Sequence, residues 1–398
     1  MSTTDIAVIG AGRIGVTIAE LLVHSGDYRV TLIDRDRTQL DRIAPAAGIL
    51  TAAIDIEAAA ESLDRLLLGK FAVLSAAPFQ LTTHIAESAR RVGVNYLDLT
   101  EDVVSAGRVQ RLAQGAVTAF IPQCGLAPGF VSIVAHDMVQ RFDTLDSIRL
   151  RVGALPRFPA NALKYSLTWS TDGVINEYCE PCEAIVDGVR RQVPPLEDRE
   201  ELTLDGTVYE AFNTSGGLGT LCDTYQGRVR ELNYRTVRYP GHAAIMRTLL
   251  SDLRLGERRH ILKDILENAL PSTTQDVVVI VVTVAGRRNG TLVQETYANT
   301  IYGSEINGQR RSAIQITTAT SICAVLDLLA AGTIPGQGFV RQEDIGLDAF
   351  LANRFGRPYV VQADRRVAVP PSEPIDGPAR EVVRTVHETG HAAALTGR

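Results

Sequence analysis

The chain has 398 residues, which exceeds one average domain and suits two, each large enough to bury its own core. Its formal net charge is −6, and its 40 lysine and arginine residues are dispersed along the chain. Neither a nucleic-acid groove nor a polybasic membrane patch is therefore expected. These properties favour a small-molecule partner, bound in the cleft that two domains leave between them.

The N-terminus and the cysteines bear on where the protein works. The first residues, MSTTDIAVIG, enter a predicted strand without the basic and apolar regions of a signal peptide, and no apolar run long enough to span a bilayer is expected. Five cysteines without framework spacing are typical of a reducing compartment, so we expect a cytoplasmic protein with free thiols. The pair Cys179 and Cys182 lacks the two further ligands of a zinc site, and no metal is expected.

The first 125 residues alternate short apolar runs with amphipathic stretches, as consecutive βαβ units do. A helix is predicted over residues 14–24. The predicted strands are 6–10, 29–34, 48–55, 71–77, 94–100 and 119–125. This rhythm predicts an α/β fold with a doubly wound parallel sheet of the Rossmann type.

The pattern changes between Pro128 and Arg311, where longer strand-like segments and hairpin-type breaks such as RRNG indicate an antiparallel or mixed sheet. The apolar segment 313–334 predicts a long buried helix that packs back on the first domain. The expected parts are a Rossmann domain (1–128 and 312–357), an inserted α+β domain (129–311) and a poorly ordered tail (361–398). In that tail, His387 and His391 are interpreted as a solvated helix face.

The motif GAGRIG, residues 10–15, fits G-x-G-x-x-G between a predicted strand and a predicted helix. Gly10 permits the tight turn, Gly12 lets a pyrophosphate approach the backbone, and Gly15 lets the helix pack closely on the strand. The anion would lie on the free N–H groups of the helix N-terminus, with Arg13 and Ile14 as further candidate contacts there.

Asp34 ends the second predicted strand, about 20 residues after the glycines. A carboxylate there accepts the ribose hydroxyls of NAD and repels a 2′-phosphate, while Arg35 can stack on adenine or meet that phosphate. NAD is the expected cofactor, with NADP left open, and Asp55 is a further candidate contact near the adenine. The residues expected under the nicotinamide ribose close the fourth strand: Ser75, Ala76, Ala77 and Pro78.

Other stretches go beyond a generic dinucleotide-binding pattern. They are VLSAAPF (73–79), YLDLTED (96–102), PQCGLAPG (122–129), LTWSTDGVINEY (167–178), FNTSGGLGTL (212–221) and RTVRYPGH (235–242). Together with IGAGRIG they resemble the saccharopine dehydrogenase-like family, and most of all its lysine 6-dehydrogenase branch. The resemblance covers residues 5–357. It implies a Rossmann domain completed by a returning C-terminal helix, an inserted mixed-sheet domain and a homodimer.

The resemblance also implies an activity: oxidation of the ε-amine of L-lysine with NAD to 2-aminoadipate 6-semialdehyde and ammonia, after which the product cyclises to piperideine-6-carboxylate. The alternative within the family is a saccharopine or carboxynorspermidine dehydrogenase-type reductase. A saccharopine-type site needs two or more cationic anchors, whereas lysine needs one. A non-catalytic NAD-sensing regulator is a third possibility, but it predicts a DNA-binding module that the sequence does not show.

The predicted base lies in DLTED, which brings Asp98 and Glu101 to the rim where the nicotinamide is expected. A lysine ε-ammonium has an ordinary pKa of about 10.4, and hydride transfer requires the neutral amine. A base must therefore take that proton and later serve the attack of water on the imine. Asp98 is the first candidate and Glu101 the second, while a merely solvated acidic loop stays open as the alternative.

The substrate α-carboxylate calls for an arginine with its fixed fork of donors. The resemblance makes Arg238 the clamp and places His242 beside it, although an exposed edge strand is the alternative for this segment. Trp169 is expected either to shape the pocket around the aliphatic stem or to pack in the core. Cys124 is interpreted as a wall of the cleft, since no base partner for a nucleophile is apparent.

Overall fold

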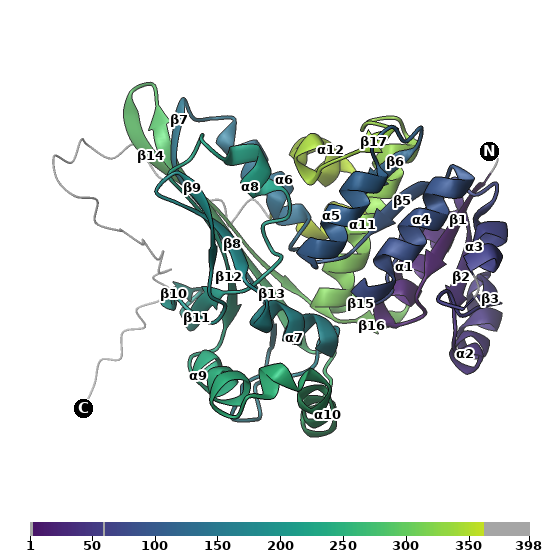
Figure 1. Cartoon of the computed structure of the whole chain (residues 1–398), viewed down its shortest axis with the longest axis horizontal. Coiled ribbons are helices and arrows are strands. Elements are labelled where there is room, and N and C mark those ends of the chain that lie inside the picture. Colours follow the sequence, from purple (N-terminus) through teal and green to yellow (C-terminus); the bar gives the residue numbers. More distant parts are fainter. Residues whose placement is uncertain (1–2, 59, 362–398) are drawn as a thin grey trace, which may run out of the picture.

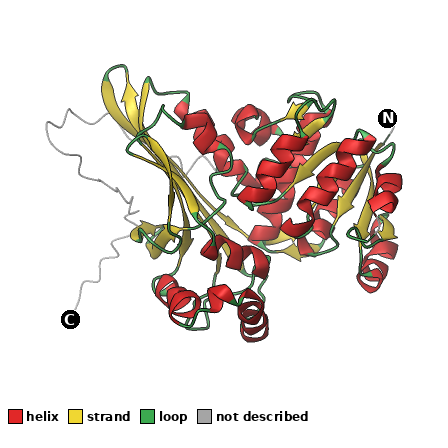
Figure 2. Cartoon of the chain, in the orientation of Figure 1, coloured by secondary structure: helices red, strands yellow, loops and turns green. Residues whose placement is uncertain are grey.

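The computed structural model describes residues 3–58 and 60–361. These residues form two large sheets on opposite sides of the molecule, with helices between and around them (Figure 1, Figure 2). The predicted tail lies outside the described residues apart from residue 361, and so do His387 and His391.

Sheet A is parallel and has seven strands within the described residues, in the order β17-β6-β5-β4-β1-β2-β3. Its strands are β1 (Thr4–Ile9), β2 (Tyr28–Asp34), β3 (Leu50–Ala53), β4 (Ala72–Ser75), β5 (Asn95–Asp98), β6 (Ala119–Ile121) and β17 (Gly338–Phe339). The chain leaves β1 in one direction for β2 and β3 and in the other for β4 to β6. The predicted Rossmann-type sheet is confirmed, and its ligand crevice lies between the ends of β1 and β4.

Helices cover both faces of sheet A. One apolar cluster joins α1 (Arg13–His24) and α11 (Ala313–Ala330) to the first face. A second cluster joins α3 (Ala60–Leu67), α4 (Thr82–Val92) and α5 (Val103–Leu112) to the other. The remaining helices of this half are α2 (Arg37–Ala47) and α12 (Leu347–Ala352). This arrangement is the doubly wound architecture that the alternating sequence pattern predicted.

Helix α11 corrects one expectation. Its 18 residues are long and apolar enough to cross a membrane by length and composition, although no such run was expected. In the structure 83% of this segment is buried inside the protein, and the helix packs against both α1 and β13. A helix that is apolar all round passes the same composition test when it fills a protein core. The predicted buried helix that returns to the first domain is thus present, and it begins at a capping box formed by Ser312 and Gln315.

Sheet C is mixed and has eight strands within the described residues. Its main path is β10-β11-β12-β7-β13-β14, with β8 paired to β12 and β9, and only the β12–β7 pair is parallel. The strands are β7 (Thr144–Pro156), β8 (Cys182–Val186), β9 (Val189–Val193), β10 (Glu200–Leu204), β11 (Thr207–Asn213), β12 (Glu231–Arg238), β13 (Asp276–Arg288) and β14 (Thr291–Tyr302). The RRNG break is a two-residue hairpin, since Asn289 and Gly290 have φ angles of 51° and 79°.

The helices of this half place the site. They are α6 (Phe130–Val139), α7 (Thr171–Cys179), α8 (Leu221–Tyr225), α9 (His242–Arg247) and α10 (Arg259–Ala269), and a small hairpin of β15 (Ser304–Ile306) and β16 (Gln309–Arg311) precedes α11. Helices α6 and α11 lie between the two sheets, whereas α7, α9 and α10 form a separate group at one end of sheet C (Figure 1). Helix α7 extends from this group to the strand ends of sheet A, where Gly173 meets Glu101.

Candidate active site

The glycine turn has the geometry that a dinucleotide needs. Gly10 has a φ of 100°, and a Cβ atom there would lie 2.7 Å from the carbonyl oxygen of Ala76. A Cβ atom on Gly15 would lie 1.8 Å from the carbonyl oxygen of Gly10, so helix and turn pack without room for a side chain. At Gly12 a Cβ atom would meet nothing within 4 Å, and no side chain caps the N-terminus of α1. The turn therefore leaves open space and free N–H groups, including those that Arg13 and Ile14 provide, where a pyrophosphate would bind.

Asp34 lies beside this turn at the end of β2. Its Oδ2 accepts a hydrogen bond from the backbone N–H of Ala11 (2.6 Å), and its Oδ1 accepts one from Asp36 (2.9 Å). These contacts fix the carboxylate at the crevice, and each oxygen keeps a lone pair for a ribose hydroxyl. Arg35 is exposed next to it. Asp55 differs from Asp34 because its side chain is exposed. Its Oδ1 accepts a hydrogen bond from the backbone N–H of Glu57 (3.1 Å) in a local turn.

The end of β4 forms the other wall of the crevice. Ser75 is buried and pairs in register with Ile9 of β1 and with Asp98 of β5. Ala76 contacts the glycine turn. Ala77 and Pro78 continue this wall outward, from half-buried to exposed.

Asp98 is held entirely by its own domain. It is 1% exposed, its Oδ1 accepts from the backbone N–H groups of Thr100 (3.0 Å) and Gln123 (2.8 Å), and its Oδ2 accepts from the hydroxyl of Tyr96 (2.7 Å). Burial raises the pKa of Asp98 to about 6, against the lowering effect of these hydrogen bonds. Three donors and full burial are typical of a carboxylate that holds neighbouring strand ends together.

Glu101 instead extends towards the second half of the chain. It is half-buried, and a Cβ atom on Gly173 of α7 would lie 2.9 Å from its Oε1 and 2.3 Å from the ring of Trp169. Its own carbonyl oxygen packs against the loop at Gly216. Burial, followed by the charges of Asp102 and Asp98, raises the pKa of Glu101 to about 7, which suits a general base near neutral pH.

Trp169 stands between the two halves. It packs against the apolar cluster that joins the two sheets and also against the cluster around α7, α9 and α10. The ring is half-buried and borders Glu101 through Gly173. Both of its predicted roles, wall and packing, are compatible with this position.

Arg238 ends β12 inside the protein, with 3% of its surface exposed. Its Nε donates to the hydroxyl of Tyr178 (2.9 Å) and its Nη1 donates to the carbonyl of Val237 (2.9 Å), while Tyr165 and Tyr178 face the guanidinium with their rings. Burial opposes its charge, but Tyr178, Tyr165 and Glu177 together raise the pKa of Arg238. Among the residues that the structure describes, no carboxylate forms a salt bridge with this guanidinium. A buried cation with free donors favours an anionic ligand.

His242 orients this arginine through Tyr178. Its Nδ1 lies 2.8 Å from the carbonyl oxygen of Leu163, which can only accept, so Nδ1 carries the proton. Its Nε2 then accepts from the Tyr178 hydroxyl (3.1 Å), which in turn accepts from Arg238. Burial, and then the charge of Arg238, lowers the pKa of His242 to about 3. The geometry gives His242 a positioning role rather than that of a base.

Two models of one protein family match almost the whole described chain. The model described as the saccharopine dehydrogenase NADP binding domain matches residues 6–120. The model described as the saccharopine dehydrogenase C-terminal domain matches residues 125–356, more than half of the chain. The chain belongs to the saccharopine dehydrogenase family.

Curated and solved relatives agree with this family. The chain is 21% identical over 189 residues to the mitochondrial alpha-aminoadipic semialdehyde synthase of Bos taurus, an alignment that covers 46% of the chain and 20% of that protein. The rat protein of the same name is 22% identical over 195 residues. The chain thus spans about a fifth of the length of these curated relatives.

Two solved structures share the fold. Saccharopine dehydrogenase (L-Glu forming) of Saccharomyces cerevisiae superposes with a TM-score of 0.70 at 17% identity, covering 89% of this chain and 96% of that one. Homospermidine synthase of Legionella pneumophila, solved in complex with NAD, superposes with a TM-score of 0.66 at 14% identity, covering 94% of this chain and 95% of that one. The α/β fold with a parallel Rossmann-like sheet and a separate mixed sheet is therefore that of saccharopine dehydrogenase. The family model for residues 6–120 is described as an NADP binding domain, and the homospermidine synthase structure contains NAD, so both support a nicotinamide cofactor.

Cys124 lies beside the end of β5, where its backbone N–H donates to the carbonyl oxygen of Asp98 (2.8 Å). This residue is fully buried, its thiol donates to the carbonyl of Ile121 (3.0 Å), and burial raises its pKa well above the ordinary value. Cys179 and Cys182 are free thiols too, and no group of three metal-binding side chains occurs within the described residues.

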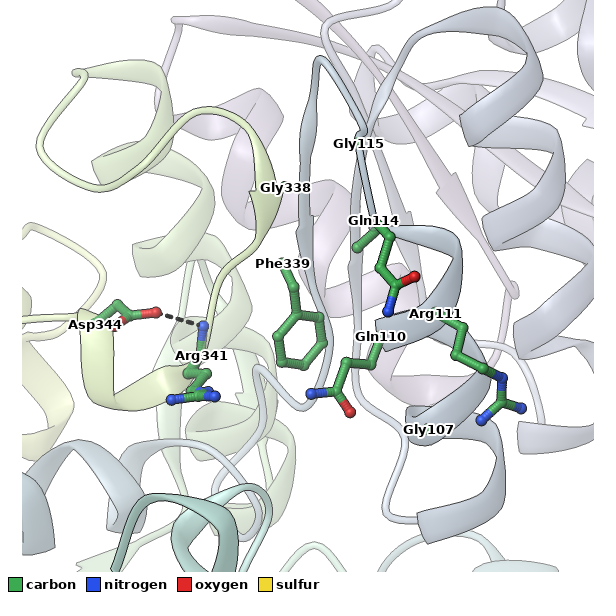
Figure 3. Close-up of a pocket in the computed structure, with 10 residues that line it drawn as sticks. Gly107, Gln110, Arg111, Gln114, Gly115, Gly338, Phe339, Arg341 and Asp344 are labelled. Atoms are coloured by element: carbon green, nitrogen blue, oxygen red, sulfur yellow. Dashed lines mark hydrogen bonds between the residues drawn. The ribbon is translucent and has the colours of Figure 1, made fainter.

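A surface hollow of about 780 Å³ lies elsewhere, between α5 and the segment after β17. Figure 3 shows Phe339 facing Gln110 and Arg111 across it, with Arg341 and Asp344 at its other side. The hollow contains none of the predicted cofactor or substrate residues.

Sequence reasoning missed Glu177, a buried acid on α7 next to Tyr178. Burial and the charge of Glu101 raise the pKa of Glu177 to about 8, while Arg238 acts to lower it. The available signal was an acid in a helix whose neighbours Val174, Ile175 and Tyr178 are apolar or aromatic.

Proposed function

We propose that the protein is an NAD-dependent dehydrogenase that oxidises the ε-amine of L-lysine to 2-aminoadipate 6-semialdehyde and ammonia, after which the product cyclises. One observation carries this proposal. Arg238 is a buried cation without a carboxylate partner in the described part of the chain, and the buried Glu177 interacts electrostatically with both Arg238 and Glu101. A substrate that offers a carboxylate at one end and an amine at the other fits these two groups.

The number of free cations favours lysine over a saccharopine-type substrate. Nearby cations are already paired with acids: Arg235 with Glu200 (2.5 Å), Arg259 with Glu180 (2.7 Å) and Lys263 with Asp172 (2.5 Å). Unlike these three, Arg238 is buried without a carboxylate partner in the described chain, so it is the anchor that we assign to a substrate carboxylate. A reductase that joins two amino acids would need a second.

The chemistry assigns a role to each residue. The nicotinamide cofactor, when bound, supplies the two-electron oxidation of the C–N bond. Arg238 binds the α-carboxylate by two N–H donors, which Tyr178 and His242 hold in place. Glu101 takes one proton from the ε-ammonium, so that the nitrogen lone pair becomes available. The same carboxyl then orients the water that adds to the imine carbon, and ammonia leaves as the C–N bond breaks.

The choice between NAD and NADP depends on Asp34. Its carboxylate faces the position of the adenosine ribose and would repel a 2′-phosphate, which favours NAD. The family model that matches this half carries NADP in its description, so the preference needs a direct measurement.

The proposal is tested by following nicotinamide absorbance and ammonia release with a panel of amines and amino acids, using NAD and NADP in turn. L-Lysine with NAD should give the highest kcat/KM. The Arg238→Lys variant should raise KM for the substrate L-lysine and leave the dissociation constant of NAD unchanged. The new side chain keeps the positive charge of Arg238 but lacks its planar set of N–H donors. Turnover of saccharopine but not of lysine would favour the saccharopine-type alternative.

A further inference from the structure

Glu177 is a buried acid that the protein itself leaves without a hydrogen-bond donor. It is 6% exposed, and within the described residues only its backbone carbonyl accepts a hydrogen bond, from Ser215 N (3.0 Å). Buried carboxyl groups normally have partners, because an unsatisfied polar group costs free energy. The hydroxyl of Thr214, one residue before Ser215, is also buried without a partner in the described chain, and the buried hydroxyls of Tyr165 and Thr168 have only each other and Trp169 as hydrogen-bonding neighbours there. Such a group of unsatisfied polar atoms is typical of a ligand site.

The position of Glu177 on α7 directs it into the substrate site. Gly173 and Glu177 are four residues apart and so lie on the same face of the helix. At Gly173 this face meets Glu101 and Trp169. The next residue after Glu177 is Tyr178, which accepts the hydrogen bond of Arg238. Glu177 therefore lies between the predicted base and the predicted carboxylate clamp.

Glu177 and Arg238 interact electrostatically, yet no salt bridge joins them in the described chain. A carboxyl group, once it is ionised, and a cation that face one site without touching match the two charges of an α-amino acid head group. Its carboxylate is suited to Arg238, and its ammonium group is suited to a carboxylate beside that arginine.

We infer that Glu177 accepts the α-ammonium group of the substrate, so that Glu177 and Arg238 together bind the zwitterionic end of a free α-amino acid. This inference rests on the proposed function and deepens it. It makes the enzyme specific for α-amino acids over diamines and over ω-amino acids that lack the α-amino group. Glu101, at the cofactor rim, remains the group that serves the reacting amine.

The test compares three substrates that differ by one group each. 6-Aminohexanoate is lysine without the α-amino group, and cadaverine is lysine without the carboxylate. In Glu177→Gln, KM for L-lysine should rise by about 10- to 100-fold, the size expected for loss of a charge-assisted hydrogen bond. KM for 6-aminohexanoate should change by less than about 3-fold, because this substrate has no group for Glu177 to bind.

The matched control is Glu180→Gln, the same substitution three residues further on, at a half-buried acid that pairs with Arg259. It should leave both KM values unchanged. Equal effects of Glu177→Gln on lysine and 6-aminohexanoate, or no effect on either, would overturn the inference. Calorimetric titration of lysine and 6-aminohexanoate gives the same comparison without turnover, so the inference is tested separately from the proposed activity.

A wild-type measurement covers the case in which Glu177→Gln does not fold. Glu177 must be ionised to bind an ammonium group, so the dissociation constant of L-lysine should fall as the pH rises through about 8, where the group titrates. The dissociation constant of 6-aminohexanoate should lack this dependence. If both ligands follow the same pH profile, Glu177 does not bind the α-ammonium group.

Discussion

At the scale of single residues, the acids of the site differ in whether the protein satisfies them. Asp98 receives three hydrogen bonds within its own domain and is fully buried. Glu101 is half-buried and extends towards α7. A base must be free to exchange a proton with the substrate, so the geometry favours Glu101 over Asp98, reversing the order expected from the sequence.

This contrast predicts that Glu101→Gln lowers mainly activity and that Asp98→Asn lowers mainly stability. Glu101→Gln should lower kcat by about 10²- to 10⁴-fold at neutral pH and recover in part near pH 10, where the substrate amine deprotonates unaided. Wild-type kcat should rise with pH through about 7, because only the ionised carboxyl accepts the proton. Steady-state kinetics across pH measures both effects.

Asp98→Asn should act mainly on stability. An amide replaces one acceptor oxygen by a donor that faces a hydroxyl or an N–H group, and the unsatisfied pair costs about 1–3 kcal/mol. Thermal and urea denaturation would detect this loss. If Asp98→Asn instead keeps full stability and its kcat falls by about 10²- to 10⁴-fold, Asp98 is the base.

Asp34 is the single residue on which the predicted preference for NAD depends. Asp34→Ser removes the charge that would repel a 2′-phosphate and leaves Arg35 free to meet it, so kcat/KM should shift from NAD towards NADP. The substitution retains a hydroxyl for the Ala11 N–H, which limits the effect on the glycine turn. A wild-type enzyme that already prefers NADP would contradict the argument.

At the scale of elements, α7 joins the two halves of the site. Gly173 lies against Glu101 and Trp169, Glu177 is buried in the proposed substrate site, and Tyr178 accepts a hydrogen bond from Arg238. Ser170 caps the helix by accepting from Gly173 N (3.2 Å). A displacement of this short helix therefore changes several contacts of the site together.

Two glycine-to-alanine substitutions test this role. In Gly173→Ala, the new Cβ atom would lie 2.3 Å from the Trp169 ring, so overpacking should cost about 1–3 kcal/mol and lower kcat/KM. In Gly107→Ala of α5, the nearest atom is Arg111 Nη1 at 3.8 Å, which is ordinary contact. This control should gain about 0.5–1 kcal/mol from helix propensity with unchanged kinetics. Denaturation and steady-state kinetics of both variants test whether α7 must lie this close to Trp169 and Glu101.

At the scale of the whole molecule, the site concentrates acids whose pKa values are raised by burial between two domains. The values for Asp98, Glu101 and Glu177 are about 6, 7 and 8. The folded protein therefore binds more protons than the unfolded chain at pH values from about 4.5, the ordinary range of these groups, up to about 8. Their neutral forms stabilise the fold at low pH, and this stabilisation is lost as the pH rises.

Without substrate, the free energy of unfolding should thus decrease from pH 5 to pH 8 through these groups. Glu177→Gln removes one buried titrating group and should flatten this dependence, whereas Glu180→Gln, at a half-buried acid, should leave it as in the wild type. Urea denaturation at several pH values measures the slope. An unchanged slope in Glu177→Gln would mean that Glu177 titrates normally in the folded protein.

The sequence by itself determined the dinucleotide-binding half of the protein. Strand and helix periodicity, with glycines at 10, 12 and 15, predicts the Rossmann-type sheet and its turn because these signals are local. Apart from β2, which ends at Asp34 as predicted, the strands of this half end earlier than predicted. For instance, β5 ends at Asp98 rather than at Thr100, since the backbone N–H of Thr100 turns back to the Asp98 carboxylate.

Only the tertiary structure decided how the acids and cations of the substrate site are matched. Asp98 ends β5 and Glu101 follows it by three residues, but their surroundings differ because Gln123 bonds the first and α7 packs against the second, and both of these are distant in sequence. Arg235 and Arg238 are likewise neighbours on β12, but Glu200 pairs with the first and leaves the second free in the described chain. Burial and long-range pairing set the charge and availability of a side chain, and neither is encoded in local spacing.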